Sequence, residues 1–472
     1  MLFQTIDYLV LLGLSLAGFF AVPQKWRWAV LLGASYWFYG SWRPEYLGLL
    51  LVSTAIDYGC GLGMMRWSGR LPRRALLWTS VACNLGILAY FKYRIFLGGI
   101  AGLTEPELLS AGSVFADFVL PVGLSFYTLQ SMGYTIDVHR GVRAAERHAG
   151  YFALYVAFFP QLVAGPIERS TVLLPQLRAF HAFDWDRCRL GGQLILLGLF
   201  KKLVVADSLA PAIAGFYADP AAASPGQAMV VGLLGLPYVY LDFSAYTDIA
   251  LGSALMFGIR LSENFRRPLS AGTIRDFWLR WHITLSRWVF DYFHRSAAEV
   301  SSSLWWRRIV LLVTFTLIGL WHGPAWTFVL FGVYHGVIVL LENAAAERRW
   351  HWPAGRAWNA LRIVRTQLLL AASSFLFLAP DLETTGAAFG RVAAIVVEGP
   401  GNPSLWLATV STFAIAGMLA VWLLNPLADR GYTGRWLGTA WRPARWAFYY
   451  ACIFVTLAFQ APRTEPFVYF QF

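Results

Sequence analysis

The chain has 472 residues, of which 58% are hydrophobic and 14% are charged, and its mean hydropathy is +0.53. A soluble protein of this length would form two or three domains, but so apolar a composition is typical of a protein that crosses a membrane several times. The net charge of +12 comes almost entirely from arginine, as expected for basic loops that follow the positive-inside rule and attract anionic lipid. The composition therefore predicts a protein embedded in a lipid bilayer and argues against nucleic-acid binding.

The sequence lacks the usual signatures of disulfides, metals and nucleotides. Its four cysteines are widely separated and show no CxxC spacing, which argues against a disulfide framework and against a zinc site. It contains no HExxH motif, no His/Cys cluster and no Walker loop. It also contains no GxSxG motif, which argues against a serine hydrolase of the α/β class. We therefore expect no metal and no bound cofactor.

The first four predicted membrane spans cover residues 6–22, 26–52, 75–96 and 118–136. The loop between the second and third spans holds four arginines between residues 66 and 74, which predicts that it lies on the cytoplasmic side. Pro121 and Gly123 interrupt the fourth span, and such breaks are tolerated in a membrane where protein or water satisfies the freed backbone groups. We expect this span to be irregular and to line an internal cavity.

The middle of the chain places charged residues inside apolar segments. Residues 151–163 form an apolar run too short to span, so a re-entrant or interfacial piece is expected. The apolar stretch 229–259 contains Asp242 and Asp248, and a carboxylate buried in such a stretch must be paired or neutralised. Asp242 is therefore predicted to bond to an arginine or a histidine of the segment that follows.

That segment, residues 261–308, is the most charged in the protein, and Arg280 and Arg287 are among its basic residues. Five apolar residues recur in it at helical spacing: Phe277, Trp278, Trp281, Leu285 and Trp288. One apolar stripe opposite a basic face predicts an amphipathic helix at the cytoplasmic interface.

The last third of the chain returns to the membrane. Residues 305–321 are predicted to enter it, a break follows at His322, Gly323 and Pro324, and residues 325–341 leave it. Three further apolar runs lie near residues 366–379, 405–424 and 447–459. The predicted fold is all-α, with about eleven transmembrane helices and at least one re-entrant or interfacial piece, in a single domain covering residues 1–472.

Two of the eight histidines differ from the rest because each lies beside a tryptophan in a segment expected to surround a buried cavity. They are His282, after Trp281, and His322, after Trp321. Ionisable groups at membrane depth are costly and usually mark a functional path. A neutral imidazole is the usual general base near pH 7, and exclusion of water keeps it neutral. The pair is thus predicted to take a proton from an alcohol that attacks an acyl carbon, or alternatively to relay protons in a transporter.

Seven motifs in this order resemble the membrane-bound O-acyltransferase family, in particular the branch of alginate O-acetylation proteins and D-alanyl teichoic acid transferases. They are LPVGLSFY at 120–127, FPQLVAGPI at 159–167, YLDFSAYTD at 240–248, ENFRRP at 263–268, FWLRWHITLS at 277–286, GLWHG at 319–323 and PFVYFQF at 466–472. The resemblance implies a ring of helices around a central tunnel that joins a cytoplasmic acyl donor to an acceptor outside. One segment, residues 289–296, departs from the alginate-type pattern, so the surface for the donor or for a partner is expected to differ there.

The resemblance also implies residue roles. His322 would be the catalytic histidine and His282 the second motif histidine, with Asp242 and Asn264 orienting the reacting groups. The flanking Trp321 and Trp281 would support the two rings. Basic residues, Arg280 and Arg287 among them, would meet the phosphates of the donor, although such arginines more commonly face lipid headgroups. Tyr469 is either a carrier of the acyl group in transit or an interfacial aromatic anchor.

The expected activity is transfer of a short acyl group, most simply acetyl, to a hydroxyl of an extracytoplasmic polysaccharide, a cell-wall glycan or an exported relay protein. The donor would be a thioester such as acetyl-CoA or an acyl carrier protein, and a periplasmic or extracellular acetyltransferase is an expected partner. Transfer of D-alanyl to a polymer like teichoic acid is the alternative within the same family. The arginine-rich, lysine-poor usage, together with the resemblance, suggests the cytoplasmic membrane of a bacterium.

Overall fold

The computed structural model describes residues 1–67, 69–103, 120–348, 353–402, 415–419, 441–461 and 466–468. Every regular element in these residues is a helix, which confirms the all-α prediction. Six stretches of helix in the described part of the chain are long and apolar enough to cross a membrane. They cover residues Pro44–Arg66, Arg70–Ile100, Pro225–Met256, Leu304–His322, Trp326–Glu347 and Arg356–Leu378. Other expected spans form shorter helices, and the expected span at 405–424 lies mostly outside the described residues.

The chain divides into two compact units, each of which is described by itself. Unit 1 comprises residues 1–195 and 247–262, and unit 2 comprises residues 196–246 and 263–472. Two helices, α10 (Trp185–Phe200) and α12 (Pro225–Met256), are shared between the units along their length. The expectation of a single domain over the whole chain stays a prediction.

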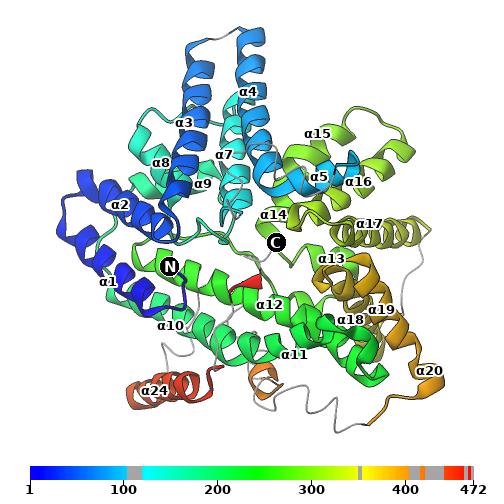
Figure 1. Cartoon of the computed structure of the whole chain (residues 1–472). Helices are drawn as coiled ribbons and strands as arrows, with labels where there is room; N and C mark the ends of the chain where they lie inside the picture. Colours follow the sequence, from blue (N-terminus) through cyan, green and yellow to red (C-terminus); the bar gives the residue numbers. More distant parts are fainter. Residues whose placement is uncertain are drawn as a thin grey trace. The chain divides into compact units, whose positions relative to one another are not determined.

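Unit 1 consists of helices of very different length, from three residues to 23 (Figure 1). They are α1 (Ile6–Ala21), η1 (Gln24–Trp26), α2 (Arg27–Gly40), α3 (Pro44–Arg66), α4 (Arg70–Leu88), η2 (Ala89–Tyr93), α5 (Arg94–Ile100), α7 (Leu124–His139), α8 (Ala149–Ala157) and α9 (Ser170–Arg178). The single span expected at 26–52 is wrong, because α2 ends at Gly40 and Pro44 begins a new helix. The expected break at Gly123 is confirmed, since this residue has a φ of 79° and α7 begins directly after it.

Unit 2 holds the remaining helices of the described residues. They are η3 (Lys201–Ala206), α11 (Asp207–Ala218), η4 (Pro220–Ala222), η5 (Pro268–Ser270), α13 (Ile274–Trp278), α14 (Ile283–Val289), η6 (Phe290–His294), α15 (Arg295–Ala298), α16 (Leu304–His322), α17 (Trp326–Glu347), α18 (Arg356–Leu378), α19 (Leu382–Ala393), α20 (Ile395–Glu398) and α24 (Arg442–Phe459), together with parts of α10 and α12. Two of these elements, η3 and η6, are π-helical turns, which often occur at functional sites.

The single amphipathic helix expected over residues 261–308 is wrong. The segment is divided into short helices, and the break between α13 and α14 falls at His282, whose φ of 41° places it in the left-handed region. The five apolar residues of the predicted stripe are nevertheless all buried: Phe277, Trp278, Trp281, Leu285 and Trp288. Helical spacing therefore identified the buried residues but did not reveal that the backbone turns between them.

Helices α16 and α17 lie side by side in unit 2 (Figure 1). Their contact is close because glycines face the partner backbone. A Cβ atom at Gly319 would meet Phe328 O and the backbone of Gly332, and a Cβ at Gly332 would meet Phe315 O. Small residues at such a crossing let two membrane helices approach closely and pack well. This packing fixes the end of α16, where His322 is the last residue.

Candidate active site

His322 lies where the sequence predicts, at the junction between two membrane helices. It is the last residue of α16, its side chain is buried, and Gly323 leaves the helix with an extended backbone. The next helix, α17, begins at Trp326. A histidine at this junction is thus held by the close packing of α16 against α17 rather than by a mobile loop.

Aromatic rings surround the His322 imidazole. Its ring centroid lies 5.2 Å from that of Trp321, 5.1 Å from Phe377 on α18, and 6.1 Å from Phe331 on α17. Phe328 follows at 6.5 Å, close to parallel with the imidazole. Rings at these distances pack against one another and exclude bulk water. These rings form an aromatic enclosure around His322.

His282 lies close to His322 in the same unit. It is fully buried and precedes α14, with its backbone in the left-handed region. Its ring contacts Phe243 of α12 edge-on at 4.8 Å and Trp321 at 5.5 Å. A left-handed backbone is unfavourable for a residue with a side chain, and such strain is commonly found at functional sites. The left-handed turn orients the His282 imidazole differently from a side chain on a continuous helix.

The side chain of Asn264 fixes the orientation of His282. Asn264 Oδ1 lies 3.1 Å from His282 Nδ1, 2.8 Å from Thr284 Oγ1 and 3.3 Å from Thr284 N. Because a backbone N–H can only donate, the atom facing Thr284 N is the amide oxygen, which then accepts a hydrogen bond from His282 Nδ1–H. The hydrogen therefore lies on Nδ1, and Nε2 carries the lone pair that can accept a proton.

The two imidazoles face each other without a direct hydrogen bond. Their centroids lie 6.4 Å apart, and the interplanar angle is 52°. Even after allowance for the ring radii, the nitrogens of the two rings are further apart than the distance of about 3 Å that a hydrogen bond requires. Burial lowers the pKa of His282 to about 3, so this ring is neutral at physiological pH. These two buried imidazoles are hereafter called the histidine pair.

Comparison with known proteins identifies the family of this chain. The family model of the membrane-bound O-acyltransferases matches residues 148–351, which include both histidines and Asn264. A probable alginate O-acetylase of Azotobacter vinelandii is 37% identical over 352 residues, which cover 73% of this chain and 69% of that protein. The chain belongs to the membrane-bound O-acyltransferase family. It is therefore a multi-pass membrane protein and an O-acyltransferase, and the transporter alternative is set aside.

Two further relatives show the breadth of the match. The peptidoglycan O-acetyltransferase of Helicobacter pylori is 33% identical over 370 residues, covering 71% of this chain and 68% of that protein. The teichoic acid D-alanyltransferase of Bacillus subtilis is 26% identical over 324 residues, covering 62% of this chain and 81% of that protein. Both resemblances named from the sequence motifs, to O-acetylation proteins and to D-alanyl transferases, are thus found.

In this O-acyltransferase the two predicted supporting tryptophans are buried beside the histidine pair. Trp321 contacts both imidazoles. Trp281 stacks on Phe277 at 5.3 Å and contacts Phe265 at 5.2 Å, which anchors the residue before His282. The structure thus brings together five of the predicted site residues: His322, His282, Trp321, Trp281 and Asn264.

The prediction for Asp242 is wrong in its partner. Asp242 Oδ1 accepts a hydrogen bond from Lys202 Nζ at 2.7 Å, and Oδ2 accepts one from Val468 N at 2.7 Å. Neither contact is to an arginine or a histidine of residues 261–308. Lys202 precedes Asp242 by 40 residues, so it lies outside the segment from which the sequence led us to expect a partner.

The predicted donor-binding arginines lie apart from the histidine pair. Arg280 Nε donates to Asp276 Oδ1 at 2.8 Å and Nη1 donates to Ser270 Oγ at 3.4 Å, so its guanidinium is engaged within its own segment. Arg287 is exposed on α14. Tyr469 falls outside the described residues, so its role stays a prediction.

A third buried histidine, His335, lies on α17. Its ring contacts Phe331 at 4.5 Å and Trp278 at 5.3 Å. In the described part of the chain neither of its ring nitrogens has a hydrogen-bond partner. His335 lines a cavity of about 10 Å³ together with Ser373 and Ser374, which is about the room that one water molecule requires. His335 therefore packs among aromatic rings beside a small cavity with a mostly apolar lining.

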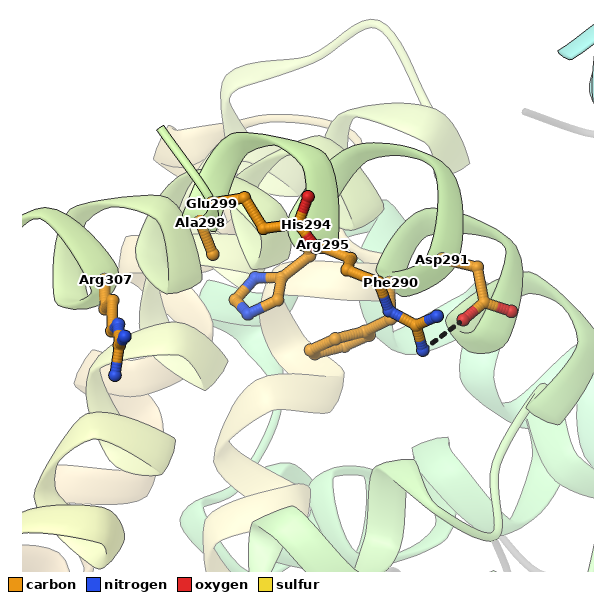
Figure 2. A pocket seen from close by; sticks show the side chains of 7 residues that line it. All are labelled: Phe290, Asp291, His294, Arg295, Ala298, Glu299 and Arg307. Atoms are coloured by element: carbon orange, nitrogen blue, oxygen red, sulfur yellow. Dashed lines mark hydrogen bonds and ion pairs between the residues drawn. The ribbon is translucent and has the colours of Figure 1, made fainter. Parts of the chain in front are cut away.

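A larger pocket includes residues of the segment that departs from the alginate-type pattern (Figure 2). This charged pocket has a volume of about 370 Å³ and is lined by Phe290, Asp291, His294, Arg295, Ala298, Glu299 and Arg307. Figure 2 shows the Arg295 guanidinium turned toward Asp291, at 3.2 Å from its Oδ1. Sequence reasoning singled out this segment as different but did not predict a pocket.

Proposed function

We propose that the protein transfers an acetyl group from a cytoplasmic thioester to a hydroxyl group of an extracytoplasmic polysaccharide or cell-wall glycan. The observation that carries this proposal is the histidine pair: two buried imidazoles, one neutral with its tautomer set by Asn264, facing each other inside an aromatic enclosure. Acyl transfer to an alcohol needs a neutral base beside the attacking oxygen, together with a site from which water is excluded.

In the proposed reaction, His322 takes the proton from the acceptor hydroxyl while its oxygen attacks the thioester carbonyl. A carbon–oxygen bond forms, the carbon–sulfur bond breaks, and the thiolate leaves and is protonated by the imidazolium. His282, which Asn264 orients through Nδ1, positions the hydroxyl or the carbonyl from the other side. A correctly placed general base contributes about 100-fold to 10,000-fold to the rate.

The donor is proposed to be acetyl-CoA or an acyl carrier protein, approached from the cytoplasmic side. Arg287 is exposed and can meet a phosphate of the donor, whereas Arg280 already pairs with Asp276. No cofactor is required by this chemistry, because the thioester itself supplies the activated acyl group. An extracytoplasmic acetyltransferase that receives the group is a compatible partner.

The names of the relatives support acetyl as the group. Relatives at 33% and 37% identity are named as a peptidoglycan O-acetyltransferase and a probable alginate O-acetylase. D-alanyl transfer to a polymer such as teichoic acid is the second candidate, favoured by the 26% identity to the Bacillus subtilis D-alanyltransferase. We place the protein in the cytoplasmic membrane of a bacterium, which agrees with the organisms of these relatives.

The test is to replace His322 with alanine in the native host and to measure ester-linked acetyl and D-alanyl groups on surface polymers by mass spectrometry. Loss of acetyl esters, with an undiminished amount of the protein in the membrane, supports the proposal. Loss of D-alanyl esters alone favours the second candidate. Unchanged esters, with the protein present, contradict both.

A further inference from the structure

A buried lysine holds the C-terminal segment, which we define as Pro466, Phe467 and Val468. An ammonium group has three N–H donors. Lys202 Nζ lies 2.7 Å from Asp242 Oδ1, 2.9 Å from Asp207 Oδ1 and 3.4 Å from Pro466 O, so an acceptor is within reach of each donor. These acceptors come from α12, α11 and the C-terminal segment, which makes Lys202 the point where three parts of unit 2 meet.

Further contacts bind the same segment. Val468 N donates to Asp242 Oδ2, the second oxygen of the carboxylate that pairs with Lys202. The Phe467 ring lies under the Lys202 ammonium at 4.5 Å and meets the Tyr246 ring edge-on at 5.2 Å. Phe467 and Val468 are each only 1% exposed, so this part of the chain is buried.

Burial of the charged cluster of Lys202, Asp207 and Asp242 costs free energy, which argues that the cluster has a role beyond packing. The side chains of Lys202, Asp207 and Asp242 are at most 1% exposed. Removing three ionisable groups from water is expensive, and apolar residues of similar volume often give equal or greater stability. Lys202 also stands on the π-helical turn η3, whose Leu203 O accepts a hydrogen bond from Ala461 N at 3.0 Å. The turn therefore binds the C-terminal region at two points.

The same turn of α12 supports the histidine pair. Asp242 is followed by Phe243, whose ring packs edge-on against His282 at 4.8 Å. Tyr240, two residues earlier, contacts the Trp281 ring at 6.1 Å. A displacement of this helical turn would thus move the C-terminal segment and the support of His282 together.

We infer that Lys202 and Asp242 are positioning residues that fix the C-terminal segment against the turn of α12 whose Phe243 packs on His282, and that acyl transfer requires this placement. The inference rests on the proposed function of the histidine pair. Tyr469 directly follows Val468 in the sequence, so any role of its hydroxyl in transfer depends on the same anchor.

Two matched variants test the placement in the full-length purified protein. Asp242→Asn leaves Lys202 paired with Asp207 but weakens both links to the C-terminal segment. Asp207→Asn makes the same chemical change and leaves Lys202 paired with Asp242, which still holds Val468. Digestion with a carboxypeptidase, followed by mass spectrometry, should stop at or before Val468 in the wild type and in Asp207→Asn. In Asp242→Asn it should pass through Val468 and Phe467 at least tenfold faster.

The second measurement is acetyl transfer by the same samples. For Asp242→Asn we expect kcat to fall at least tenfold while the KM for the thioester changes less than threefold, because the donor contacts are not altered. Asp219→Asn, an exposed helix cap elsewhere in unit 2, serves as the control for kcat. If Asp242→Asn were only less well folded, the loss of activity would instead match the fraction of the protein that thermal unfolding shows to be unfolded.

If Asp242→Asn does not accumulate in the membrane, Phe467→Ala provides the same test from the segment itself, since it removes the ring that lies against Lys202 and Tyr246. Equal protection of Val468 in Asp242→Asn and in the wild type overturns the inference, as does a released segment with unchanged kcat. His322→Ala separates the two proposals. Full activity in that variant would contradict the proposed function, whereas its C-terminal segment should stay protected in either case.

Discussion

The charged pocket and the histidine pair belong to the same unit but offer a substrate opposite environments. The charged pocket has a volume of about 370 Å³ and is open to solvent, and the side chains of Arg295 and Asp291 in it are 71% and 42% exposed. The histidine pair is enclosed by aromatic rings, and neither imidazole exceeds 2% exposure. Removal of a proton from an alcohol needs a neutral base shielded from water, so pocket size alone would point to the wrong place.

The distinction between the two regions fails if loss of a histidine in the charged pocket lowers the rate of acyl transfer as much as loss of one in the histidine pair. We expect His322→Ala to lower the rate of acyl transfer by about 100-fold to 10,000-fold, the contribution of a general base. His294→Ala removes the same side chain from the charged pocket, where its Nδ1 contacts Thr314 Oγ1 at 2.9 Å. It should change the rate by less than about threefold. Initial rates with radiolabelled acetyl-CoA measure both variants, and similar losses would refute the distinction.

The role of Asn264 sharpens the comparison, because the orientation of His282 matters only if this ring positions a reacting group. Asn264→Ala removes the acceptor of His282 Nδ1–H, so the ring can exchange tautomers and rotate. We expect kcat to fall roughly tenfold, equivalent to about 1.4 kcal/mol. Thr284→Val removes another donor to the same oxygen and leaves the imidazole bond in place, so its effect on kcat should be smaller. An inverted order of the two variants would contradict the assigned tautomer.

Features of unit 2 that depend on neighbouring residues could be predicted from the sequence, whereas contacts between residues far apart in the chain could not. The break at His322 could be predicted because Gly323 and Pro324 are adjacent to it. The bond between His282 and Asn264 joins residues 18 positions apart and needs a left-handed turn that no periodicity reveals. The same limit applies to Lys202, whose contact with Pro466 crosses 264 residues.

The dryness of the histidine pair can be measured through the pH dependence of stability. In the folded protein burial lowers the pKa of His282 to about 3, whereas the unfolded chain binds a proton there below about pH 6.5. The unfolded state therefore gains protons as pH falls, and for this residue stability decreases by about 2 kcal/mol between pH 6.5 and 5. His282→Asn, which tolerates the left-handed backbone, lacks this slope. Thermal unfolding at pH 7 and at pH 5 measures this effect. On going from pH 7 to pH 5, the wild type should lose more stability than the His282→Asn variant.

The smallest effect is expected from the basic rim of the charged pocket. Arg307→Ala should alter kcat by less than about twofold, because the pocket contributes no group to the proposed reaction. The KM values for acetyl-CoA and for an acyl carrier protein test whether the pocket binds the donor. A KM raised tenfold or more for either donor would show that the charged pocket binds the donor.

The glycine contact between α16 and α17 has a consequence for attempts to engineer this enzyme. Because a single methyl group at Gly319 would meet the backbone of the opposite helix, substitution there should force the helices apart and shift the end of α16. In a deep mutational scan, Gly319 and Gly332 should appear as intolerant as the catalytic positions, although neither touches a substrate. Libraries that seek new acyl specificities are therefore better directed at the aromatic rings around His322 than at this helix seam.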